Sequence, residues 1–364
     1  MTTQTANAEM IVLARECRGL VQSELAARIG MSQARLSRIE AGLYPPSPDD
    51  IEKLSHVLRF PESFFFQTER RYGLGVNDFY HRKRTKLATR SLDAIHARVE
   101  VIRLHVRRLL RSAELKPSYA MPDRIDLEAT EQTPEDAARA VRATWNVPRG
   151  PIESVVACLE GAGGIVIRVD FDTRLLDAVS RWLPDMPPLF IVNRSIPSDR
   201  ERYTLAHELG HLVLHASPHP EMEIEANRFA SEFLMPEAEI KASLYDLSLA
   251  KLGSLKRYWK VSMAALIRRG FDLGTITERR YRSLNIQLSR AGYKLREPAE
   301  TDPPREETTL MEGLIEFHIR ELSFAIEELA TYLHVTVDDL LAVYEIDAPF
   351  HSGTPRRILR AVPR

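Results

Sequence analysis

Two histidines four residues apart constrain this chain more than any other feature: His207-Glu208-Leu-Gly-His211. On a helix, this spacing puts both imidazoles on one face, close enough to share one metal ion. Glu208 directly follows the first histidine, where a carboxylate can reach a water at the metal without being a ligand itself. The stretch therefore predicts a helix that carries part of a metal site.

A site of the catalytic zinc type needs a third protein ligand and an open water position. Glu223 comes twelve residues after His211 and starts a second stretch of helical apolar spacing, which Pro236 ends. Two antiparallel helices joined by a short turn would bring Glu223 under the histidine pair. Glu225 is the competing ligand, and Glu223 is preferred because Asn227, four residues further on, could hold a neighbouring group by hydrogen bonding. Two ordinary core or surface histidines are the plain alternative, but the helical context and the acidic second helix favour a metal site.

Residues 202–215 read RYTLAHELGHLVLH, and residues 223–236 read EIEANRFASEFLMP. Together they resemble the ImmA/IrrE family of metallopeptidases, and the likeness extends from about residue 133 to residue 298. The resemblance implies one Zn²⁺ per chain, which another divalent metal could replace, and a peptidase with a narrow protein substrate.

The zinc ligands that the resemblance implies are His207, His211 and Glu223, and the implied general base is Glu208. Peptide cleavage also needs an oxyanion donor. Tyr203 and His215 are both near in sequence, and the choice between them stays open. His215 could instead cap its helix, where a cationic ring suits the C-terminal dipole.

A second constrained stretch, residues 22–42, has apolar residues at helical spacing on both sides of Gly30. The glycine permits a tight turn, and Ser32 suits the N-cap of the helix that follows. This pattern, which continues to Leu58, resembles the XRE (lambda-repressor-like) family of helix-turn-helix proteins. We therefore expect an all-α DNA-binding domain over residues 1–68.

The second helix of such a unit lies in the major groove of double-stranded DNA. Outward glutamine and arginine side chains can pair with adenine and guanine, whereas serine and an N-terminal glutamine suit phosphates. The side chains expected to contact DNA are Gln22, Ser32, Gln33, Arg35, Ser37 and Arg38. The alternative is a helical hairpin that makes protein contacts and has an ordinary solvated polar face.

The charge distribution agrees with a polyanion partner for the first third of the chain. Residues 1–115 carry a net charge of +6 and residues 116–364 a net charge of −7. The two cysteines, Cys17 and Cys158, lie far apart and fit a reducing compartment. No stretch approaches 18 apolar residues and no early run resembles a signal peptide, so we expect a cytoplasmic protein without a membrane segment.

Residues 69–132 are expected to hold a basic linker and one long helix. The run 81–86 could follow a phosphate backbone or simply be solvated. Residues 92–111 have apolar positions three and four apart, which could form a homodimer seam or pack against the helix's own domain. The proline-containing residues 113–132 resemble a linker.

Strands are expected at 165–169 and 189–193 within an α+β zincin-like peptidase domain over residues 133–296. An exposed strand edge there could receive an extended peptide. The proline- and glutamate-rich residues 297–309 suggest another linker. Residues 310–364 suggest a small helical unit that could be a docking or sensing module, or a helical cap.

The sequence thus predicts a multidomain, mainly α chain with an N-terminal helix-turn-helix domain, an α+β zincin-like metallopeptidase domain and a small C-terminal helical unit. The corresponding function is a cytoplasmic transcriptional regulator whose zinc-dependent endopeptidase cleaves a repressor-type protein, or itself, in a stress or signal response. A self-cut within 70–91 or 113–132 would separate the DNA reader from the rest. The alternative is a DNA-binding transcription factor whose zincin-like domain senses a ligand or metal and cuts nothing.

Overall fold

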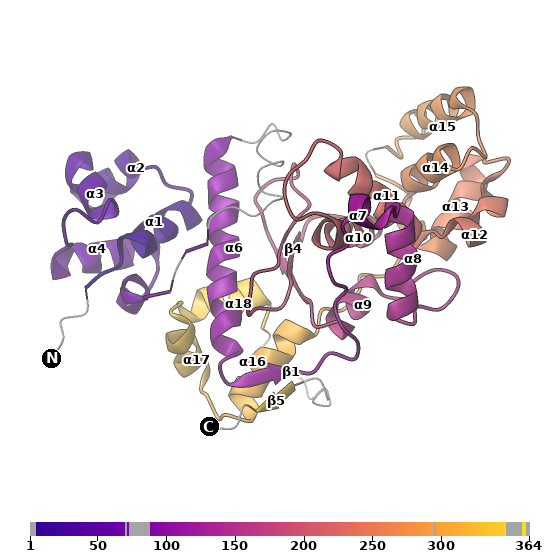
Figure 1. Ribbon diagram of the computed structural model, residues 1–364. Helices are drawn as coiled ribbons and strands as arrows, with labels where there is room; N and C mark the ends of the chain where they lie inside the picture. Colours follow the sequence, from indigo (N-terminus) through magenta and orange to yellow (C-terminus); the bar gives the residue numbers. More distant parts are fainter. Residues whose placement is uncertain (1–4, 70, 73–87, 295, 347–358, 362–364) are drawn as a thin grey trace. The chain divides into compact units, whose positions relative to one another are not determined.

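The computed structural model describes residues 5–69, 71–72, 88–294, 296–346 and 359–361. The chain forms two compact units (Figure 1). The first unit combines residues 1–116 with residues 309–364, and the second unit comprises residues 117–308. The chain therefore leaves the first unit and returns to it. The basic run 81–86 lies outside the described residues.

The first unit begins with the helix-turn-helix bundle. Its elements are α1 (Ala8–Cys17), α2 (Gln22–Arg28), α3 (Gln33–Glu40), α4 (Pro48–Leu58) and the 3₁₀ helix η1 (Glu62–Phe66). Gly30 has φ +67°, the left-handed conformation that the turn between α2 and α3 requires. Ser32 caps α3, and Ser47 with Asp50 forms a capping box at the start of α4. Leu25, Leu36 and their apolar neighbours form a buried core.

The long helix α6 (Thr89–Leu109) supports this bundle and the C-terminal part of the same unit. Ala97, Val101 and Leu104 of α6 join the core of the bundle. The C-terminal part contains α16 (Leu310–Arg320), α17 (Ile326–Leu333) and α18 (Val337–Tyr344). Helices α16 and α17 contact α6, and the short strands β1 (Ala113–Leu115) and β5 (Leu359–Ala361) pair antiparallel (Figure 1).

The apolar seam expected along this helix is buried inside the chain. Its residues are Leu92, Ile95, Val99, Ile102, Val106 and Leu109. Of the two readings of the seam, packing within the protein agrees with this burial, because a dimer interface would need these side chains at the surface. The helix also buries an ion pair between Glu100 and Arg103, 2.8 Å long.

The second unit contains a small mixed sheet among helices. Its elements are α7 (Leu127–Thr130), α8 (Pro134–Thr144), α9 (Val155–Gly161), β2 (Ile165–Val169), β3 (Ala178–Arg181), β4 (Leu189–Asn193), α10 (Ser198–Leu214), α11 (Met222–Leu234), α12 (Glu237–Ile240), η2 (Lys241–Leu244), α13 (Leu249–Trp259), α14 (Met263–Asp272), α15 (Glu278–Arg290) and η3 (Ala299–Thr301). The strand order is β2-β4-β3, with β2 parallel and β3 antiparallel to β4. Strands β2 and β4 have the predicted bounds, whereas β3 was not predicted.

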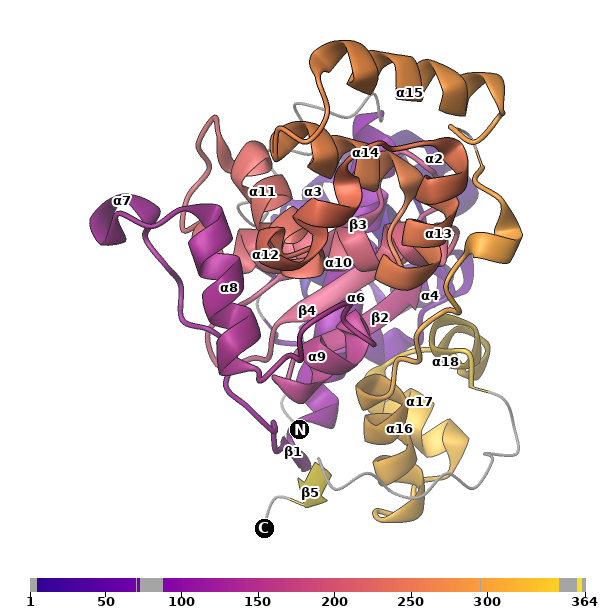
Figure 2. The same cartoon turned by 90° about the vertical axis from the view of Figure 1, so that its right-hand side faces the viewer.

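The core of the second unit lies between the sheet and the helices α8 to α11 (Figure 2). Residues 117–132, which have the composition of a linker, lie along this core: Tyr119, Met121, Ile125 and Leu127 pack against it. Helices α13 to α15 contact one another and continue the same core. None of the described helices is long and apolar enough to cross a membrane. The chain is thus multidomain and mainly α.

Candidate metal centre and DNA-reading helix

Helices α10 and α11 form the framework of the candidate metal centre. Their axes come close because Gly210 faces α11: a Cβ at this position would lie 3.3 Å from the backbone of Ala226 and 3.1 Å from the ring of Phe229. Ala226 and Phe229 are themselves fully buried. The small residue therefore sets the separation of the two helices that carry the candidate ligands.

The structure brings together His207, His211 and Glu223, whose nitrogen and oxygen atoms all lie within 4.8 Å of one another. Nε2 of His207 is 3.0 Å from Nε2 of His211, which is 3.4 Å from Oε1 of Glu223. The third side, from His207 Nε2 to Glu223 Oε2, is 3.9 Å. In a tetrahedral zinc site with bonds of about 2.0–2.1 Å, neighbouring ligand atoms are about 3.3–3.4 Å apart. The three measured distances lie around that value, so the residues fit such an ion.

Glu208, the candidate general base, is 2% exposed and lies on the same helix as the two histidines. Its Oε2 accepts a hydrogen bond from Oγ of Ser180, 2.5 Å long. Ser180 belongs to β3, and sequence reasoning missed it because that four-residue strand was not recognised. The four residues of β3 are buried. Binding of an extended peptide at an edge of this sheet stays a prediction.

The competing ligand Glu225 belongs to a different group. Its Oε2 is 3.0 Å from Nε2 of His215 and 3.4 Å from Nε2 of His219, and the three residues form a second trio of metal-ligand type. Burial, helped by the neighbouring His211, lowers the pKa of His215 to about 3. A neutral ring at this position does not fit the expected helix cap by a cationic histidine.

Asn227 and Tyr203 bind backbone and polar groups on α11. The amide nitrogen of Asn227 donates to the carbonyl of Glu223, 2.6 Å away, and so holds the ligand's backbone, not its carboxylate. The hydroxyl of Tyr203 is 3.1 Å from Ser231 Oγ and 3.3 Å from the carbonyl of Asn227. Both candidate oxyanion donors, Tyr203 and His215, are therefore engaged with other side chains.

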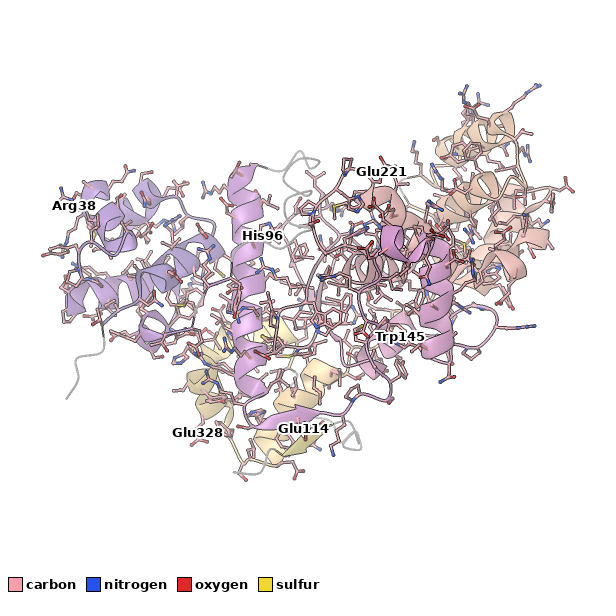
Figure 3. All side chains as sticks on the ribbon, in the orientation of Figure 1. Arg38, His96, Glu114, Trp145, Glu221 and Glu328 are labelled. Carbon is pink, nitrogen blue, oxygen red and sulfur yellow. The ribbon has the colours of Figure 1, made fainter. Side chains whose placement is uncertain are left out.

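On α3, the helix expected to enter the major groove, Leu36 and Ile39 face the core, while Gln33, Ser37 and Arg38 are exposed. Arg38 is labelled in Figure 3. The hydroxyl of Ser32 accepts a hydrogen bond from the backbone of Arg35, 3.3 Å away, as expected for a cap. The sequence pattern and the structure thus agree on the surface that α3 presents.

Two of the expected DNA contacts also bind inside the domain. Arg35 forms a 2.6 Å ion pair with Asp50, a carboxylate that is only 3% exposed. The amide of Gln22 donates to Glu40 at 2.8 Å. Arg35 therefore has a structural partner that the sequence did not indicate, because Asp50 lies on the following helix, α4, 15 residues further along the chain.

Comparison with protein families identifies both parts of the chain. A model of the IrrE N-terminal-like domain, a peptidase family, matches residues 162–270, and a helix-turn-helix model matches residues 11–65. The first match includes β2 to α13, most of α14 and every residue of both histidine groups. No curated protein matches the chain. The chain therefore joins an XRE-like helix-turn-helix domain, typical of DNA-binding regulators, to a domain of the ImmA/IrrE peptidase family in one polypeptide.

Proposed function

We propose that the second unit is a zinc-dependent endopeptidase that cleaves a repressor-type protein and so links proteolysis to the DNA-binding domain. The observation that supports this most is the trio of His207, His211 and Glu223 with Glu208 beside it on the same helix. Two imidazoles and one carboxylate are the donor set of catalytic zinc sites that keep a position open for water.

In this proposal the ion, when bound, supplies Lewis-acid activation of the water and of the substrate carbonyl. Glu208 accepts the proton of the attacking water and later gives it to the leaving amine. The hydrogen bond from Ser180 to Oε2 holds the carboxylate of Glu208 in place. Ser180 is thus a positioning residue for Glu208.

Metal content and Glu208→Gln together test the proposal. Wild-type protein should hold about one zinc per chain, and His211→Ala should lose it. Glu208→Gln should keep zinc and operator binding but lose the new protein N-termini that the wild type produces when it is expressed in its source cells. Glu221→Gln, a change at an exposed carboxylate that starts α11, is the matched control and should cleave like the wild type.

These experiments distinguish a peptidase from a metal or ligand sensor. If Glu208→Gln regulates transcription like the wild type, the second unit is a metal or ligand sensor and the peptidase proposal fails. If the wild type holds no zinc even when zinc is offered, both the peptidase and the metal sensor are excluded. Self-cleavage is tested by the intact mass of zinc-loaded protein, because an unchanged mass over long incubation contradicts it.

A further inference from the structure

Four histidines at intervals of four residues follow one another from α10 into the loop before α11, and only two of them belong to the proposed zinc site. His215 is the C-cap of α10, and His219 lies in the loop. Both face Glu225 on α11, at 3.0 and 3.4 Å from its Oε2. This second trio repeats the two-imidazole, one-carboxylate chemistry of the first.

The two trios touch through their inner histidines. Nδ1 of His211 is 2.9 Å from Nδ1 of His215. At that distance one nitrogen must carry a hydrogen and the other a lone pair, because two N–H groups facing each other would repel. The contact therefore holds one proton, and the position of this proton decides which ring nitrogens can bind a metal.

An ion at the first trio sets the proton in one position. When a metal ion binds Nε2 of His211, the neutral ring carries its hydrogen on Nδ1. This Nδ1–H then donates to Nδ1 of His215. His215 then carries its own hydrogen on Nε2, directed at Glu225 Oε2, 3.0 Å away. In this state His215 and Glu225 support His211, and Nε2 of His215 has no lone pair for a second ion.

We propose that His215, His219 and Glu225 form a second divalent-cation site, and that an ion at either site lowers the metal affinity of the other. This proposal rests on the zinc site of the proposed function. A cation at the second trio needs the lone pair of His215 Nε2, so the hydrogen of His215 moves to Nδ1 and faces the hydrogen of His211. Each site therefore weakens the other. The ligand class is a cation that accepts imidazole, such as Zn²⁺, Co²⁺ or Ni²⁺, and not Mg²⁺ or Ca²⁺.

The surroundings make the second trio accessible and the weaker of the two. His215 is buried, whereas the side chain of His219 is 38% exposed and lies in a loop, so ordering it costs conformational entropy. Arg228, the nearest cation along α11, is bound to Glu135 at 2.7 Å and does not occupy Glu225. The second site should therefore fill only when metal is in excess, and an ion bound there would lower the affinity of the proposed peptidase site for its own ion.

Equilibrium titration of the full chain with Zn²⁺, followed by calorimetry, tests the proposal without any activity measurement. His207→Ala disables the first site and should leave one weak binding event, which His207→Ala/His219→Ala should lack. In wild-type protein loaded with one zinc, the second ion should bind at least about tenfold more weakly than in His207→Ala, because two loaded sites place the hydrogens of His211 and His215 against each other. His219→Asn is the second variant in case the alanine alters the loop, and Glu221→Gln is the control for a general loss of acidic charge. Glu221 starts α11 (Figure 3).

The position of the proton has its own readout. Long-range ¹H–¹⁵N spectra of the histidine rings should show His215 with hydrogen on Nε2 in the singly loaded protein, and on Nδ1 in His207→Ala at excess zinc. Equal affinities of the second trio in both backgrounds would overturn the opposition, and the absence of a His219-dependent event in His207→Ala would overturn the site itself. Failure of the proposed function gives a different result in the same Zn²⁺ titration. In that case His207→Ala and His211→Ala bind zinc as the wild type does.

Discussion

Arg35 and Arg38 lie three residues apart on α3, but their side chains have different surroundings. Arg35 is 45% exposed and pairs with the buried Asp50, whereas Arg38 is exposed. We expect Arg38→Ala to weaken operator binding by about 1–3 kcal/mol if it reads a base, without lowering the melting temperature. Arg35→Ala should lower the melting temperature as well, because Asp50 loses its cation. Fluorescence anisotropy on operator variants, with thermal unfolding of the same samples, separates the two roles. Unchanged affinity of Arg38→Ala on every sequence would remove α3 as the reading helix.

Gly210 controls the metal centre through helix separation. In Gly210→Ala, the new methyl would meet the backbone of Ala226 at 3.3 Å, and backbone cannot move aside as a flexible side chain can. We expect a loss of about 1–3 kcal/mol in unfolding free energy and weaker zinc binding, because α11 carries Glu223 away from the histidines.

Gly253 of α13 provides the matched control for this change. It is also helical, but a Cβ there meets only Met263 Cε at 3.6 Å, an ordinary contact. Gly253→Ala should therefore stabilise the protein by up to about 1 kcal/mol through helix propensity alone, with unchanged zinc binding. If both variants behave alike in chemical denaturation and zinc titration, the close approach of α10 and α11 is not what positions the ligands.

At the scale of elements, one buried lysine joins α13 to the start of α10. Nζ of Lys256 is 2.5 Å from Asp199, 2.8 Å from Glu297 and 2.7 Å from Asp302. Burial alone would lower the pKa of Lys256, but its hydrogen bonds to these carboxylates raise it above the ordinary value. The lysine thus stays charged and fixes the residues after α15 against α10.

Lys256→Met should destabilise the second unit by about 3–5 kcal/mol, because it leaves the buried Asp199 and the half-buried Glu297 and Asp302 without their cation. Arg257→Met, at the exposed neighbouring position, should change the unfolding free energy by no more than about 0.5 kcal/mol. Urea unfolding monitored by the tryptophans of this unit gives both values. A loss in Lys256→Met no larger than in the control would mean that solvent or rearranged side chains compensate the carboxylates.

The contact between His105 of α6 and Tyr344 of α18 should make the stability of the first unit fall at low pH. Nδ1 of His105 is 2.7 Å from the hydroxyl of Tyr344, and burial, with the nearby Arg108, lowers the pKa of His105 to about 3. The unfolded chain takes up a proton near pH 6.5 but the folded chain does not, so stability is complete above that pH and falls as the pH drops toward the folded value. The loss should be about 1.4 kcal/mol at pH 5.5.

Denaturation of variants at several pH values checks this assignment. His105→Gln should flatten the slope of stability against pH between about 6.5 and 4 by one proton. Tyr344→Phe removes the hydrogen-bond partner but keeps the titrating ring, so it should lower stability and retain the slope. An unchanged slope in His105→Gln would assign the acid sensitivity to other groups.

The sequence predicted most elements whose pattern is long enough to repeat. The periodic helices α3, α6, α10 and α11, and the apolar strands β2 and β4, were recognised because each carries its own signal. Strand β3 has four residues, too few for an alternation to stand out, and Ser180 was missed with it. Two partners of Lys256, Asp199 and Glu297, lie 57 and 41 residues away in the chain, and no local pattern encodes such pairs.

In the candidate site too, residues with a local sequence pattern were predicted and contacts without one were not. The pairing of His207 with His211 follows from helical spacing. The addition of Glu223 followed from the expectation that a short turn makes the second helix run antiparallel to the first. The second trio was not anticipated, although His215, His219 and Glu225 were all visible in the sequence. Spacing in the sequence alone cannot show that Nδ1 of His211 lies beside Nδ1 of His215.

At the scale of the whole molecule, the first unit is built from both ends of the chain, and this changes what a cut would do. Residues 1–116 and 309–364 are joined by side-chain contacts: Arg18 pairs with Asp339 at 2.5 Å, and the hydroxyl of Tyr332 donates to the carbonyl of Arg108 at 2.8 Å. The C-terminal helices therefore behave as a cap on α6. A self-cut within 117–132 would leave these contacts intact.

We therefore predict that cutting the chain after residue 116 does not release the DNA reader. A specific protease site inserted between the exposed residues Lys116 and Pro117 should yield two fragments that co-elute at low micromolar concentration and keep operator affinity. Asp339→Ala combined with Tyr332→Phe removes two of the contacts and should weaken the association of the fragments, while the same double variant left uncut should stay folded because the chain still connects the two parts. Fragments that separate without these substitutions would show that covalent continuity holds the first unit together, and cleavage at this point could then act directly as the release step.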